Sequence, residues 1–426
     1  MQNKERLILL VTAFIVIFGF LTITASLFAA NQEKVLHSFN DNGSDGTFPG
    51  NSLTFDAAGN LYGAAAEGGA YGYGMIFQLT PGAGGTWTET VLHNFNQDGT
   101  DGIFPNGGLI FDARGTGNLY GTTLEGGAKR FGTVFQLTPG TDGTWTETIL
   151  YNFSGSDGSD GAEPRDGLIF DGAGNLYGTT SVGGATGQDC NGLGCGAVFQ
   201  LAPGAGGTWT ETVLFSFNRP GKGGVLPYAG LVLDSAGNLY GTTTQGGGQG
   251  CGGFGCGIIF KLTPGRGGTW IEAKLHSFNG KNGQFPTSSL IFDAKGNLYG
   301  TARSVFQLAP QANGQWTEKV LHIFTNKFAG PCCSLIFDAA GNLYGTTSGG
   351  GTHSAGTVFE LTPGAKGRWT QKVLHYFSDK GKDGFQPSSG LIFDGDGNLY
   401  GVTSRGGAHP KSCGGGGCGT VFEVMP

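Results

Sequence analysis

The chain has 426 residues, 85 of them glycine and only 13 % of them charged, and its formal net charge is −7. This acidic balance, without any basic stripe, argues against a nucleic-acid partner, because phosphate binding needs clustered cations. Apolar residues reach 38 % and recur in short runs between the glycines, which argues against a disordered low-complexity chain.

The first 30 residues predict an export signal. Lys4 and Arg6 precede an apolar stretch at residues 7–28, and two alanines follow it. The stretch is also long enough to span a bilayer, so a cleaved signal peptide and an uncleaved N-terminal anchor both stay open. Either one places residues 31–426 outside the cytoplasm, where disulfides persist. We expect a secreted or cell-envelope protein that contacts a membrane only through residues 7–28, if they are not cleaved.

A repeat of roughly 57 residues fills the rest of the chain. The string Gly-Asn-Leu-Tyr-Gly begins at Gly59, Gly117, Gly174, Gly237, Gly296, Gly341 and Gly397. Each copy carries four short runs of β-branched and aromatic residues bounded by Gly, Pro, Asn or Asp, which is typical of strands. We name these strands A to D; in the second copy they are residues 109–112, 119–123, 133–138 and 145–153. Seven four-stranded units predict an all-β, seven-bladed β-propeller.

The two ends of the chain predict how the ring closes. The last copy ends with a C strand at residues 420–424, and no D strand follows it. Residues 31–39 match the D strand of the first copy, at residues 87–95. We therefore expect the N-terminal strand to complete the last blade. The alternative fold is an open β-solenoid. It would not explain why a D strand stands at the start and is missing from the last copy, and it would need end caps.

The repeats resemble those of the GloVer tandem-repeat proteins, exported bacterial proteins also described as "choice-of-anchor". The resemblance rests on the seven Gly-Asn-Leu-Tyr-Gly strings, on the Gly-Gly that follows most of them, and on Gly-x-Val-Phe-x-Leu strands such as residues 356–361. It covers residues 33–426. It implies export, but it implies no activity and no cofactor.

Loop variation predicts a binding face. The D–A and B–C loops share one face of a propeller, here called the variable face, and they carry almost all the differences between copies. The two residues after each loop proline should ring the mouth of the central channel and differ in every blade. The predicted ligand-binding residues are Asn51, Asn106, Arg165, Asp166, Tyr228, Thr287, Cys332, Cys333 and Ser388. The alternative is that they are solvated linker residues without a ligand.

The eight cysteines form four pairs. Three share one spacing in B–C loops and predict disulfides: Cys190 with Cys195, Cys251 with Cys256, and Cys413 with Cys418. A zinc site shared by the first two pairs is the alternative, although the third pair has no such neighbour. The adjacent Cys332 and Cys333 are either two free thiols or a vicinal disulfide.

Other polar residues predict no catalytic group, no metal ligand set and no cofactor. Five histidines occupy one repeat position that Tyr151 and Phe215 also fill, which indicates packing: His37, His93, His276, His322 and His375. An Asp-Gly-x-x-Pro motif at four D–A loops indicates turns, and six Trp at the starts of D strands indicate packing at the blade edge. Glu67 and Glu125, placed in B–C loops, could serve glycoside hydrolysis if they lay close together.

Three function classes remain open. The leading hypothesis is a non-catalytic extracellular binding or scaffold protein that uses the variable face, with a glycan or a cell-surface protein as partner. The alternatives are an exported carbohydrate-active enzyme that uses loop carboxylates, and a purely structural surface protein. Loop acids of the first three blades, Asp101 and Asp160 among them, also predict that one side of the variable face is acidic.

Overall fold

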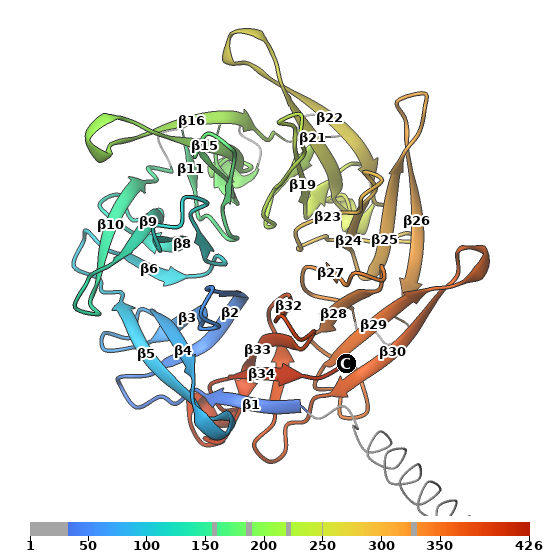
Figure 1. Cartoon of the computed structure of the whole chain (residues 1–426). Coiled ribbons are helices and arrows are strands. Elements are labelled where there is room, and N and C mark those ends of the chain that lie inside the picture. The colour runs from blue at the N-terminus through green and yellow to red at the C-terminus, as the bar shows by residue number, and fades with distance from the viewer. Residues whose placement is uncertain (1–32, 156–159, 185–189, 219–222, 249, 325–329) are drawn as a thin grey trace, which may run out of the picture.

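The chain folds into a closed ring of seven antiparallel β-sheets, the blades, arranged around a central axis (Figure 1). The structure, a computed structural model, describes residues 33–155, 160–184, 190–218, 223–248, 250–324 and 330–426. The predicted signal or anchor at residues 1–30 lies outside this part. Within the described residues, no helix is long and apolar enough to cross a membrane.

In each blade the A strand lies nearest the axis and the D strand lies outermost (Figure 1). The strands of blades 1 to 3 are β2 (Gly46–Phe55), β3 (Leu61–Gly68), β4 (Met75–Pro81) and β5 (Trp87–Asn94); β6 (Gly102–Pro105), β7 (Ile110–Phe111), β8 (Leu119–Gly126), β9 (Thr133–Pro139) and β10 (Trp145–Asn152); β11 (Gly161–Ala162), β12 (Ile169–Phe170), β13 (Leu176–Thr180), β14 (Val182–Gly183), β15 (Ala197–Pro203) and β16 (Trp209–Ser216). Those of blades 4 and 5 are β17 (Gly224–Val225), β18 (Val232–Leu233), β19 (Leu239–Thr243), β20 (Gln245–Gly246), β21 (Ile258–Pro264) and β22 (Trp270–Ser277); β23 (Ile291–Phe292), β24 (Leu298–Thr301), β25 (Ser304–Pro310) and β26 (Trp316–Ile323). Those of blades 6 and 7 are β27 (Ile336–Phe337), β28 (Leu343–Thr347), β29 (Thr357–Pro363) and β30 (Trp369–Tyr376); β31 (Gly384–Pro387), β32 (Ile392–Phe393), β33 (Leu399–Gly406), β34 (Thr420–Val424) and β1 (Glu33–Ser38).

Short 3-10 turns punctuate the loops. Four lie in C–D hairpins: η1 (Ala83–Gly85), η3 (Ala205–Gly207), η5 (Arg266–Gly268) and η6 (Ala365–Gly367). Three lie in the cysteine-containing B–C loops: η2 (Cys190–Gly192), η4 (Cys251–Gly253) and η7 (Cys413–Gly415).

The turn between strands A and B explains the repeated Gly-Asn-Leu-Tyr-Gly string. In blade 1 the Asp56 carboxylate accepts hydrogen bonds from the Asn60 backbone and side chain and from the Tyr62 hydroxyl. The same contacts recur at Asp171, Asp234, Asp293, Asp338 and Asp394. The last glycine of the string makes room for the core, because a Cβ on Gly63 would lie 2.5 Å from the Phe77 ring. The string therefore specifies the hairpin and its packing.

Strand A is longer than the sequence predicts in five blades: it is one continuous strand in blade 1 and two separate pieces in blades 2, 3, 4 and 7. In blade 2 the first half, β6, pairs with the end of β8, and the second half, β7, pairs with its beginning. The Asp-Gly-x-x-Pro motif is therefore mostly strand rather than turn. Phe104, before the motif's proline, has φ 58° and donates its backbone N–H to the Tyr73 carbonyl of blade 1 at 2.9 Å. Equivalent bonds start at Phe48, Glu163, Leu226, Phe285 and Gln386, so the residue before the loop proline fastens each of these blades to the preceding one, with or without the Asp of the motif.

The hydrophobic core is divided into clusters between neighbouring blades. One cluster combines Tyr62 and Phe95 of blade 1 with Leu119 and Phe135 of blade 2. At every junction a Phe that follows strand D packs on a Phe in strand C of the next blade, with ring centroids 5.0–5.3 Å apart. The pairs are Phe39–Phe77, Phe95–Phe135, Phe153–Phe199, Phe217–Phe260, Phe278–Phe306, Phe324–Phe359 and Phe377–Phe422. Edge-to-face contacts of this kind stabilise the junctions beyond burial alone.

The N-terminal strand closes the ring, which confirms the prediction. β1 pairs with β34 from Glu33 opposite Val424 to Ser38 opposite Thr420. The pairing continues as Phe39 donates its backbone N–H to Gly419 at 3.0 Å. Figure 1 shows the blue first strand beside the red last strands in one sheet. Closure covers a sheet edge that would otherwise be exposed.

Candidate functional site

The predicted mouth residues lie between the loop proline and the Leu of strand A, beside a level of the ring that we call the waist. The waist consists of the residue before the Leu of strand A, which is Gly or Ser in every blade: Ser52, Gly108, Gly167, Gly230, Ser289, Ser334 and Gly390. A Cβ on Gly167 would lie 3.0 Å from the Gly108 carbonyl, and one on Gly390 would lie 3.0 Å from the Ser52 hydroxyl. Small residues therefore allow neighbouring inner strands to approach closely at this level.

The Asp166 carboxylate lies within the waist and joins three blades. It accepts hydrogen bonds from the backbone N–H groups of Gly167 at 2.7 Å and Gly230 at 2.6 Å, and from the Ser289 hydroxyl at 3.0 Å. Burial raises the pKa of Asp166, and these hydrogen bonds oppose the shift. The Oδ2 atom of Asp166 thus joins the inner strands of blades 4 and 5 to that of blade 3, whereas Oδ1 accepts only from the next residue of its own strand.

Arg165 makes several polar contacts at the mouth. Its Nη2 donates to Glu163 Oε2 at 2.8 Å, and its Nε donates to the Ser181 hydroxyl at 3.1 Å. Its guanidinium also lies over the Tyr228 ring of blade 4, 4.8 Å from the centroid. The Arg165 side chain is 31 % exposed, so it is fixed and still accessible. A cation held in this way on an aromatic face is preorganised for a ligand.

The other predicted mouth residues also lie where neighbouring blades meet. A Cβ on Gly50 of blade 1 would lie 3.6 Å from the Asn106 side-chain oxygen of blade 2. The Ser388 hydroxyl donates to the Pro49 carbonyl at 2.8 Å, and the Thr287 hydroxyl donates to the Cys332 carbonyl at 3.5 Å. Asn51 lies in β2, and its side chain lies outside the described part. Cys333 is buried, the Asp166 carboxylate is desolvated within the waist, and the role of the remaining positions in binding a ligand stays a prediction.

A hollow of about 340 Å³ opens beside this mouth between blades 5 and 6. It is lined by Phe285, Thr287, Thr301, Arg303, Gly330, Pro331, Cys332 and Ser348. Blade 5 has the shortest B–C loop of the chain. Two grooves of about 130 and 400 Å³ on the opposite face are lined by the repeat's own Trp, Tyr, Phe and Pro residues. Among these three depressions, the hollow on the variable face is lined by residues that differ between blades.

The cysteine predictions are confirmed for the three spaced pairs. Disulfides join Cys190 with Cys195, Cys251 with Cys256, and Cys413 with Cys418. The alternative of a shared zinc site is therefore wrong. Cys332 and Cys333 are free thiols; a hydrogen bond between them lowers the pKa of Cys332 and raises that of Cys333. The disulfides are typical of a protein located outside the cytoplasm.

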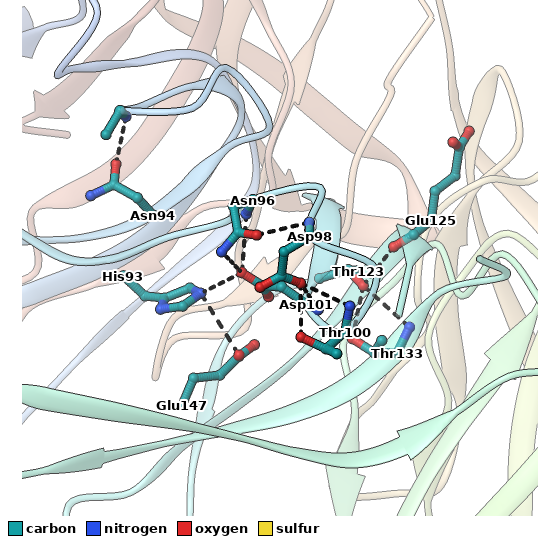
Figure 2. A network of polar contacts seen from close by, with 11 residues as sticks. His93, Asn94, Asn96, Asp98, Thr100, Asp101, Thr123, Glu125, Thr133 and Glu147 are labelled. Atoms are coloured by element: carbon teal, nitrogen blue, oxygen red, sulfur yellow. Dashed lines mark hydrogen bonds and ion pairs between the residues drawn. The ribbon is translucent and has the colours of Figure 1, made fainter. Parts of the chain in front are cut away.

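The histidine position does more than pack, which corrects the prediction. Figure 2 shows His93 of strand D in blade 1 facing Asp101 and Glu147 of blade 2. Its Nε2 lies 3.2 Å from Asp101 Oδ2 and 3.8 Å from Glu147 Oε2. Its ring also packs edge-on against Phe95, with centroids 4.6 Å apart. We call this set of three side chains a junction triad.

The triad positions recur around the ring with different residues. They hold His37, Asp45 and Glu89 at junction 7/1; His93, Asp101 and Glu147 at 1/2; Tyr151, Asp160 and Glu211 at 2/3; Phe215, Gly223 and Glu272 at 3/4; His276, Asn282 and Glu318 at 4/5; His322 and Gln371 at 5/6; and His375, Asp383 and Glu33 at 6/7. Sequence reasoning treated the His and the Asp separately and missed the Glu. The signal was present, because His and the motif's Asp occur together in three copies and are both replaced in the copy with Phe215 and Gly223.

Two further predictions need correction. Asp45, Asp101 and Asp160 are buried rather than displayed, with 9 %, 6 % and 4 % of their surface exposed, so these three acids do not contribute to the predicted acidic side of the variable face, whereas Asp41 and Asp98 are exposed. Glu67 and Glu125 lie near the ends of β3 and β8, not in B–C loops.

The tryptophans pack as predicted. Trp145 of blade 2, for example, lies 6.1 Å from Tyr62 of blade 1, ring centre to ring centre. Such contacts recur for Trp87, Trp209, Trp270, Trp316 and Trp369, each against the Tyr of the preceding blade. The six Trp therefore belong to the inter-blade packing.

The family assignment rests on the repeat just described. The Gloeobacter/Verrucomicrobia repeat matches residues 22–188 and 303–426, which is more than half of the chain. The chain belongs to this GloVer repeat family. No curated protein matches the chain. Between the two matched segments, the described residues of the range 189–302 form strands of the same blade pattern.

Solved structures share the fold of this GloVer protein at low identity. The extracellular domain of a protein from B. thetaiotaomicron, described as a hybrid two-component system, is 14 % identical with a TM-score of 0.54. A second such domain from the same organism is 13 % identical with a TM-score of 0.51. The matches cover 93 % of this chain but only 43 % and 41 % of those chains. At this identity the likeness shows the fold alone.

Proposed function

We propose that this GloVer-repeat protein is a non-catalytic binding protein of the cell envelope or the extracellular space, and that it holds a glycan at the mouth of the variable face. The observation that carries the proposal is the Arg165–Tyr228 pair. Its guanidinium is fixed by contacts from two blades while a third of the side chain stays exposed. A guanidinium held on an aromatic ring offers preorganised hydrogen-bond donors to the hydroxyl groups of a sugar.

The carboxylates next to the mouth favour binding over hydrolysis. Glycoside hydrolysis needs two carboxyl groups that are free to exchange protons with the substrate. Glu163 is paired with Arg165 at 2.8 Å, and Asp166 is held by donors of the waist. The hollow between blades 5 and 6 gives a glycan room to extend from the mouth.

The proposal is tested by probing a glycan array with the labelled full-length chain, followed by titration of the best glycan. Arg165→Ala removes a charged donor, a loss of about 1.5–3 kcal/mol, and should weaken binding about tenfold or more. Tyr228→Ala should weaken it in the same direction. The control is Arg114→Ala, because Arg114 is an exposed arginine in an A–B hairpin, on the opposite face.

Retention of a glycan by the parent chain and its loss in the two mouth variants would support the proposal. It would be overturned if no glycan on the array were retained. It would also be overturned if Arg165→Ala and Arg114→Ala bound the glycan equally well.

A further inference from the structure

Three of the junction triads are intact, each combining one imidazole with two carboxylates from two blades. In each triad one ligand-type atom per residue lies within 4.8 Å of the others: His37, Asp45 and Glu89; His93, Asp101 and Glu147; and His375, Asp383 and Glu33. The imidazole Nε2 lies 3.5, 3.2 and 3.4 Å from the Asp carboxylate in these three sites, in the same order. It lies 3.7 and 3.8 Å from the Glu carboxylate in the first two.

The triads contain polar atoms that the protein itself does not satisfy. Among the described residues, twelve buried side-chain nitrogen or oxygen atoms lack a hydrogen-bond partner, and seven of them belong to these three sites. They are Nε2 of His37 and His375, Oδ1 of Asp101 and Asp383, and Oε1 of Glu33, Glu89 and Glu147. The Asp101 side chain is only 6 % exposed. Buried polar groups of this kind usually have a partner, so their concentration here indicates a bound species.

The spacing and chemistry fit a metal ion. Ligand atoms about 2.0–2.1 Å from a tetrahedral zinc ion lie about 3.3 Å from one another, close to the imidazole–carboxylate separations. We propose that the three intact junction triads each bind a divalent transition-metal ion of the zinc class through His Nε2, the Asp carboxylate and the Glu carboxylate. Three protein ligands leave a fourth position for water.

The surroundings of the ligands support this assignment. Each imidazole is held edge-on by the Phe two residues later, with ring centroids 4.6 Å apart. Backbone N–H groups hold the Asp carboxylates, for example those of Asn96 on Asp101 at 3.0 Å and Ser378 on Asp383 at 2.9 Å. Such outer contacts orient metal ligands. Asp101 also lines a hollow of about 270 Å³ on the blade 2 side of junction 1/2.

A cation would also offset the electrostatic cost of the triads. Two carboxylates that approach one another in a desolvated site are unfavourable unless a positive charge joins them.

The three sites flank the point where the ring closes. They lie at the consecutive junctions 6/7, 7/1 and 1/2. β1 supplies Glu33 to the first and His37 to the second, so metal binding would fasten the closing strand to both neighbouring blades. Because metal binding to the folded form is linked to folding, it would stabilise the closed ring.

The other junctions provide matched controls within the chain. Phe215 occupies the histidine position at junction 3/4, so the fold accepts Phe there. Asn282 occupies the aspartate position at junction 4/5, where it contacts His276 and Glu318. His322 keeps the histidine position at junction 5/6, but Gln371 replaces the Glu there.

The test measures zinc binding to the full-length chain after metal removal with EDTA. Cys332 and Cys333 are first replaced by Ser, because free thiols also bind zinc. Titration calorimetry should give three equivalents of Zn²⁺, and Zn²⁺ should raise the Tm. His37→Phe, His93→Phe and His375→Phe should each remove one equivalent, and the triple variant should bind none and lose the Tm increase. His322→Phe should keep all three equivalents.

A His→Phe variant is used only if circular dichroism and gel filtration show that it folds. Otherwise Asp101→Asn replaces it as the test variant, because Asn282 occupies the equivalent position at junction 4/5. It should bind two equivalents. The proposal is overturned if the parent chain binds no zinc, or if the number of equivalents is unchanged in the folded variants. A Tm that does not rise on addition of Zn²⁺ would overturn it as well, whatever the response of the Tm to pH. The glycan site at the mouth contains none of these residues, so the two proposals can fail separately.

Discussion

A single phenylalanine after each D strand carries much of the contact between blades. Phe95 is fully buried, and it lies between His93 of its own blade and Phe135 of the next. The same residue therefore fills the core and fixes an imidazole of a junction triad. Its neighbours come from different blades, so a cavity left at this position cannot be closed by a shift within one sheet.

We expect Phe95→Ala to lower the free energy of unfolding by about 3–5 kcal/mol, the usual cost of deleting a buried aromatic ring. Urea unfolding followed by circular dichroism measures the loss. The control is Tyr71→Ala, because Tyr71 is 61 % exposed and its removal should change stability by less than about 0.5 kcal/mol. Equal losses for the two variants would contradict a stabilising role of the junction phenylalanines.

Among the strands, β1 is the one that closes the ring, because it completes the sheet of the last blade. β1 covers the outer edge of β34 over its full length. Without β1, the backbone groups of β34 would face solvent as an open edge, which favours pairing between molecules.

Deletion of residues 33–38 should therefore give oligomers or aggregates instead of a monomer, as measured by gel filtration with light scattering. Lys34→Ala is the matched control, because it removes the exposed ion pair with Glu423 at 3.8 Å but keeps the strand pairing. This control should behave like the parent chain. A deletion variant that stayed monomeric with an unchanged β-sheet spectrum would show that closure does not depend on β1.

The sequence predicted the elements whose signals are local and periodic. Four strands per copy, the A–B turn and the disulfides follow from strings that recur at fixed spacing. The first half of strand A was missed because Asp-Gly-x-x-Pro is typical of turns, whereas here its glycine and the residues around it pair with the extended end of strand B. Glu67 and Glu125 were misplaced for the same reason, since the end of strand B was taken for loop.

The candidate sites were harder to predict because they combine blades. The positions at the mouth were identified from variation after the loop proline, but the sequence could not show that Asp166 turns into the waist toward Gly230 and Ser289. A junction triad joins three segments of two blades, with Glu147 lying 54 residues beyond His93 in the chain. Only the packing of one blade on the next brings them together.

For the molecule as a whole, buried acids at the junctions predict how stability depends on pH. Burial, with a contribution from Asp160, raises the pKa of Glu211 to about 7 from an ordinary value of 4.5. Burial also raises the pKa of Glu272 and Glu318. The folded chain holds these protons more tightly than the unfolded chain, so their contribution to stability is present at low pH and is lost as the pH rises through about 7.

The Asp residues of the A–B turns change the stability in the opposite direction, at lower pH. Hydrogen bonds from Asn and Tyr side chains and from backbone N–H groups lower the pKa of Asp56, Asp171 and the equivalent residues, against the effect of partial burial. A carboxylate with a lowered pKa stabilises the fold above its ordinary pKa, and this contribution is lost as the pH falls through the folded value. The two sets of acids together place the highest stability in mildly acidic solution.

The variant Glu211→Gln tests how much a junction acid contributes to the pH dependence of stability, apart from the turn Asp residues. Gln resembles the protonated carboxyl, so the variant should match the parent chain at pH 5 and should have a higher Tm than the parent at pH 8. Thermal unfolding across this range, in EDTA to exclude metal binding, measures the difference. Glu67→Gln is the control at an exposed position and should keep the slope of the parent chain. If Glu211→Gln kept that slope as well, the proton on Glu211 would have no part in holding blade 2 against blade 3, and the pH dependence would have to come from the other junctions.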